Sequence, residues 1–65
     1  MSYISLLNQL KDMVKVLEIS LIDAEKLVHK GNQKSGVRIR KNMQQIREQA
    51  KIAREMVQFI KQKDN

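Results

Sequence analysis

Residues Lys30–Lys41 read KGNQKSGVRIRK and contain both glycines of a chain that has no proline. Glycine commonly follows the last residue of a helix, because it readily adopts the left-handed backbone conformation found there. Asparagine is a favoured N-cap for a helix that follows. Gly31 and Asn32 therefore predict that one helix ends and another begins at this point. Ser35 is a second candidate N-cap, so the second helix is expected to start within residues 33–36.

Apolar residues recur at alternating intervals of four and three on both sides of this turn, which is the heptad spacing of helices that pack side by side. The stripe before the turn, the main stripe, consists of Tyr3, Leu7, Leu10, Val14, Leu17, Leu21, Ala24 and Val28. The stripe after the turn consists of Ile39, Met43, Ile46, Ala50, Ala53, Val57 and Ile60. Because the connection is short, the two helices must run antiparallel. The sequence predicts an all-α fold, a hairpin of two long helices with coiled-coil spacing and a turn at Lys30–Asn32.

A chain of 65 residues allows a single domain, residues 1–65, and a core of this size is marginal. The chain has no cysteine, so disulfides cannot compensate. Further apolar residues, among them Leu6, Met13 and Leu27, form a row beside the main stripe and widen the apolar face. We therefore expect a homo-oligomer, either a dimer that forms a four-helix bundle or a tetramer.

The charge is strongly basic and unevenly placed. The net charge is +6, and no acidic residue occurs between Glu25 and Glu48. Such an excess indicates a polyanionic partner, with nucleic acid the first candidate. The cations form two rows on the second helix: Lys34, Arg38 and Lys41 in one, and Arg40, Arg47, Lys51 and Arg54 in the other. Lys26 and Lys30 approach the first row from the end of the first helix, and the N-terminal N–H groups of the second helix are expected at the same end.

Catalysis has little support in this sequence. The chain has one histidine, His29, no cysteine and no glycine-rich phosphate loop, so we expect no enzymatic activity, cofactor, metal or small-molecule substrate. Asp12, Glu18, Asp23 and Glu25 are interpreted as solvated charges on the helix surface. No apolar run approaches the roughly 20 residues that span a bilayer, and no secretory signal is visible. We expect a cytoplasmic protein.

Two other partners remain open on the residues alone. A helical bundle with a basic end could dock an acidic protein, and a basic helix could lie on an anionic membrane, although the cations cluster at a turn and not beside a wide apolar face. RNA is an alternative to DNA, because phosphate contacts do not distinguish the two. Gly36 is open as well. It is either an interior helical residue that lets a backbone or phosphate approach, or the first residue after a Ser35 cap.

The same segment resembles a known family. It is similar to the pattern K-G-N-x-x-small-G-x-R-x-R-K of the bacterial linker-histone-like proteins, of which the chlamydial histone-like nucleoid proteins are the best known. The agreement covers Lys30, Gly31, Asn32, Ser35, Gly36, Arg38, Arg40 and Lys41. Val37 and Ile39 are bulkier than the small residues common there. Outside the motif the resemblance is a pattern: an amphipathic helix before it and a long basic helix after it.

The resemblance implies a nucleoid-associated protein that binds double-stranded DNA and helps to organise or compact the chromosome. It implies DNA contacts from Lys30, Lys34, Arg38, Arg40 and Lys41, with Gly31, Asn32 and Gly36 shaping the turn. Better-known members continue into a Lys/Ala/Pro-rich tail thought to drive condensation. The 65 residues of this sequence correspond to the helical part, so binding by the helical core is the expectation.

Overall fold

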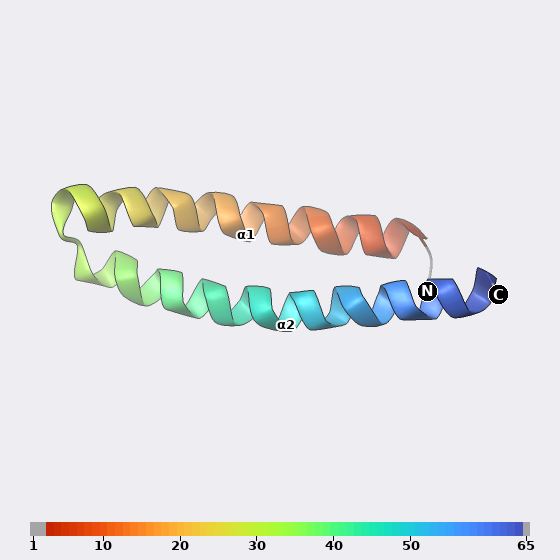
Figure 1. Cartoon of the computed structure of the whole chain (residues 1–65). Coiled ribbons are helices and arrows are strands. Elements are labelled where there is room, and N and C mark those ends of the chain that lie inside the picture. Colours follow the sequence, from red (N-terminus) through yellow and green to blue (C-terminus); the bar gives the residue numbers. More distant parts are fainter. Residues whose placement is uncertain (1–2, 65) are drawn as a thin grey trace.

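The computed structural model describes residues 3–64, which form two helices joined by a two-residue turn. Helix α1 spans Tyr3–Lys30 and helix α2 spans Gln33–Asp64. They run antiparallel along most of their length, and the turn lies at one end of the molecule (Figure 1). The hairpin is elongated, with extents of 52 × 16 × 12 Å. The all-α hairpin predicted from the heptad spacing is confirmed.

The turn is built by backbone hydrogen bonds around Gly31. This residue has a φ of +63°, and its N–H donates to the carbonyl oxygen of Leu27 at 3.0 Å, which closes the end of α1. The side-chain Oδ1 of Asn32 accepts from the N–H groups of Lys34 at 3.1 Å and Ser35 at 3.3 Å. Asn32 is therefore the N-cap of α2, and the alternative cap at Ser35 is excluded.

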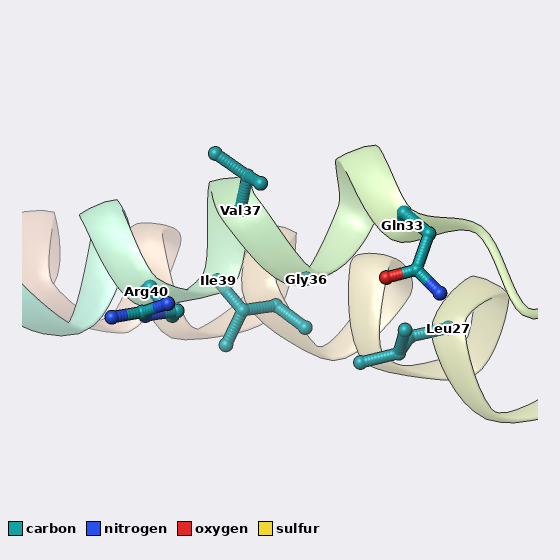
Figure 2. Close-up of a pocket in the computed structure, with 6 residues that line it drawn as sticks. All are labelled: Leu27, Gln33, Gly36, Val37, Ile39 and Arg40. Atoms are coloured by element: carbon teal, nitrogen blue, oxygen red, sulfur yellow. The ribbon is translucent and has the colours of Figure 1, made fainter.

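Gly36 consequently lies inside the first turns of α2. A methyl group built on its Cα would lie 3.6 Å from Cδ2 and 3.7 Å from Cδ1 of Leu27, which are ordinary van der Waals distances. Figure 2 shows Gly36 beside Leu27 where the two helices meet. The site therefore has room for alanine, so close packing of the helices does not require a glycine here.

The row of α1 that meets α2 is not the main stripe. Most residues of α1 that are buried or half-buried follow a heptad row shifted by one position, namely Leu6, Gln9, Met13, Val16, Ser20, Asp23 and Leu27. Most of the main stripe stays exposed, to 62% at Leu21 and 76% at Val28. In α2, by contrast, Ile39, Ile46, Ala53 and Ile60 of the predicted stripe do lie at the seam, buried or half-buried.

The seam between the helices is thus rich in polar residues. In the described part of the chain, Ala53 is the one buried apolar residue, at 8% exposure, whereas Ser20, Asp23 and Ser35 are buried polar residues. Gln9 crosses the seam as well, and its Nε2 donates to the carbonyl oxygen of Gln49 at 3.1 Å. A single hairpin therefore leaves most of its apolar surface in contact with water, which is typical of a chain that associates further.

Candidate nucleic-acid interface

Four lysines lie in the half of the hairpin that ends at the turn, and all four are exposed. We call them the basic tip: Lys26 and Lys30 in the last turns of α1, and Lys34 and Lys41 in the first turns of α2. None of them forms an ion pair within residues 3–64. Their ammonium groups keep their hydration and flexible stems, so they are available to an anion from solution. The structure places Lys30, Lys34 and Lys41 towards the same end of the hairpin, and their contact with a nucleic acid stays a prediction.

The backbone contributes less to this end than we expected. Two of the N–H groups at the start of α2, those of Lys34 and Ser35, already donate to the side chain of Asn32. They are not free to bind a phosphate while the cap is in place. The attraction of the tip for anions therefore comes mainly from its lysine side chains, with the partial positive charge of the helix N-terminus added to it.

Arg38 differs from the lysines because it has a partner in the chain. Its Nε donates to Oδ1 of Asp23 at 3.1 Å, and its Nη2 donates to the same oxygen at 2.9 Å. Nη2 also donates to Oγ of Ser35 at 3.0 Å. The side chain of Arg38 is still 48% exposed, whereas that of Asp23 is almost completely covered. Arg38 therefore links the helices and offers only part of its guanidinium to solvent.

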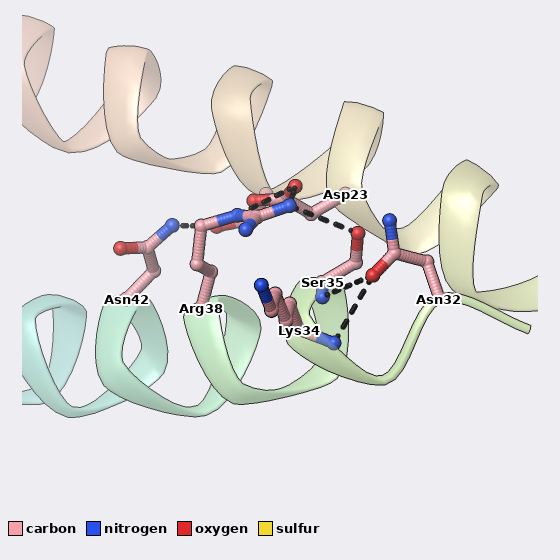
Figure 3. A network of polar contacts seen from close by, with 7 residues as sticks. Asp23, Asn32, Lys34, Ser35, Arg38 and Asn42 are labelled. Atoms are coloured by element: carbon pink, nitrogen blue, oxygen red, sulfur yellow. Dashed lines mark hydrogen bonds and ion pairs between the residues drawn. The ribbon is translucent and has the colours of Figure 1, made fainter.

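The interpretation of Asp23 as a solvated surface charge is wrong. The residue is 5% exposed and faces α2 across the seam (Figure 3). The hydrogen bonds from Arg38 lower the pKa of the Asp23 carboxyl below its ordinary value, against the opposing effect of burial. The same contact raises the pKa of Arg38. A charged aspartate is tolerated here because a guanidinium neutralises it.

A second polar contact extends the network along the seam. Nδ2 of Asn42 donates to Oγ of Ser20 at 3.1 Å, and this hydroxyl donates in turn to the carbonyl oxygen of Val16 at 2.8 Å. Ser35, which accepts from Arg38, is fully buried. These polar pairs fix the alignment of the two helices near the turn, because a shift along the seam would leave buried groups without partners.

The second predicted row of cations lies elsewhere. Arg40, Arg47, Lys51 and Arg54 are exposed and run along α2 away from the turn. Arg40 lines a shallow cavity of about 350 Å³ together with Gly36 and Leu27 (Figure 2), on the face opposite to the polar network. The structure therefore places the two rows on different faces of α2, and Arg40 lies as near to the turn as Lys41 does.

Other kinds of site find no support in the part of the chain that the structure describes. No group of three or more His, Asp or Glu side chains within residues 3–64 is placed to hold a metal ion. Neither helix has an apolar stretch long enough to cross a membrane.

A hairpin of two long helices, with exposed lysines near its turn and a net charge of +6, defines a basic helical protein with a cationic end. Comparison with protein families is more specific. Residues 4–63 match the family of the histone H1-like protein Hc1. The chain belongs to this histone H1-like family, which confirms the resemblance seen in the turn segment. No curated protein and no solved structure matches the chain.

Proposed function

We propose that this protein is a histone-like, nucleoid-associated protein that binds double-stranded DNA largely without sequence specificity. The observation that carries the proposal is the basic tip, whose four exposed lysines form no salt bridge in the described hairpin, although the charge of Lys26 also acts on the nearby Asp23. Membership of the histone H1-like family supports DNA as the polyanion. Its place in the cell would be the nucleoid, in the cytoplasm, and its role the organisation or compaction of the chromosome.

The mechanism is the neutralisation of phosphates by lysine. Each lysine that approaches a phosphate releases condensed counterions, and this release drives binding at low salt. Lys30, Lys34 and Lys41 would contact the backbone of the duplex directly. Arg38 would contribute with the part of its guanidinium that Asp23 and Ser35 leave exposed. Contacts of this kind position a protein on DNA and carry no sequence information.

Gly31, Asn32 and Gly36 would act by shaping the tip and not by touching DNA. Gly31 and Asn32 reverse the chain within two residues, which brings lysines from both helices to one end. Homo-oligomerisation would then supply more than one tip to a duplex. The exposed main stripe of α1 supports association, because monomeric proteins rarely expose a continuous apolar surface of this length.

An electrophoretic mobility-shift assay with random-sequence duplex at about 50 mM salt tests the proposal. We expect retardation that weakens steeply as salt is raised and that differs little between sequences of equal length. The absence of any shift at this salt concentration would contradict DNA binding. The same assay with double-stranded RNA measures the preference between the two nucleic acids.

A protein-interaction module that docks an acidic partner is the second candidate. The exposed apolar stripe beside exposed cations favours it, because that combination also suits an acidic amphipathic helix. This candidate requires a saturable complex with a protein and no salt-steep binding to DNA. The mobility-shift assay therefore separates the two candidates.

A further inference from the structure

The hairpin has two broad faces, and the polar network occupies one of them. Asp23 and Arg38 are seen on the face drawn in Figure 3, and Gly36 and Arg40 on the opposite face, drawn in Figure 2. Each residue of a helix turns by about 100°. Ala24, the residue after Asp23, is therefore rotated by this angle across the seam and lies on the same face as Gly36. Ala24 belongs to the main stripe. The main stripe therefore lies on the face away from the polar network.

Helix α2 adds apolar residues to the same face. Met43, Ala50 and Val57 follow Gly36 at intervals of seven, which keeps them on one side of a helix that packs in heptads. Met43 and Val57 are exposed. Together with the main stripe of α1 they form a two-helix apolar surface along the hairpin, which we call the apolar face. It has the shape of half of a four-helix bundle.

The two edges of the apolar face carry different charges. Along the outer edge of α1 the heptad repeat places Lys11, Glu18 and Glu25, and along the outer edge of α2 it places Arg40, Arg47 and Arg54. All six are exposed, and none forms an ion pair in the described hairpin. One edge is therefore mostly acidic and the other wholly basic. When two copies pack face to face, the acidic edge of one can lie along the basic edge of the other, at a similar distance from the turn.

Only one two-fold arrangement uses this complementarity. If the axis runs parallel to the helices, α1 lies on α2 of the second copy, and Glu18 and Glu25 come beside Arg47 and Arg40 of that copy. If the axis runs across the helices, α2 lies on α2, and Arg47 meets its own counterpart. The first arrangement gives two attractive pairs for each copy and one repulsive pair, between Lys11 and Arg54 of the other copy. The second arrangement brings the arginines of the two copies together, which is repulsive.

We propose that two copies pack through the apolar face about an axis parallel to the helices, with α1 of each on α2 of the other. Both turns then lie at the same end, and the two basic tips stand side by side. This inference rests on the proposed DNA binding only for its consequence, that both tips contact one stretch of duplex. Arg40 and Arg47 then serve the dimer, and the lysines of the tip serve the DNA.

Disulfide trapping tests the arrangement, because the chain has no cysteine of its own. Val14 of one copy and Ala50 of the other lie at the same height in the proposed dimer. A mixture of Val14→Cys and Ala50→Cys chains should give the mixed disulfide on mild oxidation, since Cα atoms must approach within about 7 Å. Val14→Cys alone should give no disulfide, because the two copies of Val14 lie diagonally across the bundle.

Charge reversal provides an independent test. We expect Glu18→Arg, and separately Arg47→Glu, to raise the dissociation constant of the dimer about three- to tenfold, and the double variant to restore it. Glu48→Arg is the matched control, since it changes the net charge as Glu18→Arg does. Glu48 lies on α2, rotated by about 100° from Arg47, and so points away from the proposed contact. Sedimentation equilibrium at one ionic strength gives the constants.

The two proposals fail in different ways. Self-linking of Val14→Cys, or a Glu18→Arg variant that dimerises as tightly as the Glu48→Arg control, would overturn this packing and leave any DNA shift unaffected. A mixed Val14–Ala50 disulfide supports the packing whatever the outcome of the mobility-shift assay. If that disulfide forms and no DNA shift is seen, it is the proposed function that is wrong.

Discussion

Asp23 and Arg38 form the ion pair that links the two helices, with Nε and Nη2 of the arginine both directed at Oδ1 of the aspartate, at 3.1 and 2.9 Å. The carboxylate is covered and the guanidinium is half exposed. The pair thus stands between the seam and the basic tip. It explains why an arginine within the cationic segment has a structural role that its lysine neighbours lack.

Acid should destabilise the hairpin through this pair. The folded state lowers the pKa of Asp23, so the stabilisation is fully present above the ordinary carboxyl pKa of about 3.9 and disappears as pH falls through the folded value. We expect the thermal unfolding midpoint to decrease as the pH is lowered through this acidic range. Circular dichroism at one protein concentration measures it. Asp23→Asn should lower the midpoint at neutral pH and flatten its acid dependence. Asp12→Asn, which changes an exposed aspartate of α1, is the control.

Arg38 should matter for stability in a way that Lys34 does not. Arg38→Lys removes the guanidinium that reaches both Asp23 and Ser35, and an ammonium group cannot reproduce that geometry. We expect a lower unfolding midpoint in urea for Arg38→Lys at constant net charge. Lys34→Ala, which removes a charge from an exposed side chain, should leave the midpoint close to that of the unaltered chain. Equal midpoints for the two variants would show that the hydrogen bonds specific to the guanidinium add no stability.

The two glycines should respond in opposite directions to alanine. Gly31→Ala forces a residue with a Cβ into a φ of +63°, which costs about 1–2 kcal/mol. Gly36→Ala places a methyl group at ordinary contact distance from Leu27 inside a helix, which should stabilise by about 0.5–1 kcal/mol. Urea unfolding at one protein concentration measures both. Destabilisation by Gly36→Ala would show that the helices must approach more closely than the structure indicates.

The cap of α2 gives a further measurable change. Asn32→Ala removes the acceptor for two N–H groups, those of Lys34 and Ser35, and should cost about 1 kcal/mol. Asn32→Asp keeps an acceptor at the same position and should retain most of the stability. Similar losses of stability for both variants in urea unfolding would mean that the side chain of Asn32 does not cap the helix.

The sequence predicts the hairpin and its turn well, because heptad spacing and the Gly31–Asn32 pair act locally. It does not by itself say which row of α1 meets α2, since two adjacent rows both repeat in heptads. A usable signal was the symmetry about the turn. Ser20 and Asn42 each lie eleven residues from Gly31, and Asp23 and Arg38 lie eight and seven residues from it. Polar residues at matched distances from a tight turn indicate the seam between antiparallel helices.

The same reasoning accounts for the outcome at the candidate site. Exposed lysines such as Lys30 and Lys34 can be assigned to the tip from their distance to the turn alone. Arg38 cannot, because its orientation depends on a carboxylate fifteen residues earlier in the chain, at Asp23. The position of Arg40 on the opposite face likewise depends on which faces of the helices pack together, and that is a property of the assembled hairpin.

Removing tip lysines should make DNA binding less dependent on salt, because fewer phosphates are then neutralised. The double variant Lys34→Ala and Lys41→Ala removes two exposed cations of the basic tip. If each neutralises one phosphate, the slope of log K against log salt should become less steep by about 2, because each neutralised phosphate contributes about 0.9. The double variant Lys15→Ala and Lys61→Ala removes the same charge at exposed positions away from the turn, and its slope should change much less. The slopes are measured by titrating DNA with protein at a series of salt concentrations. Equal reductions of the slope in both double variants would show that net charge, and not the tip, governs binding.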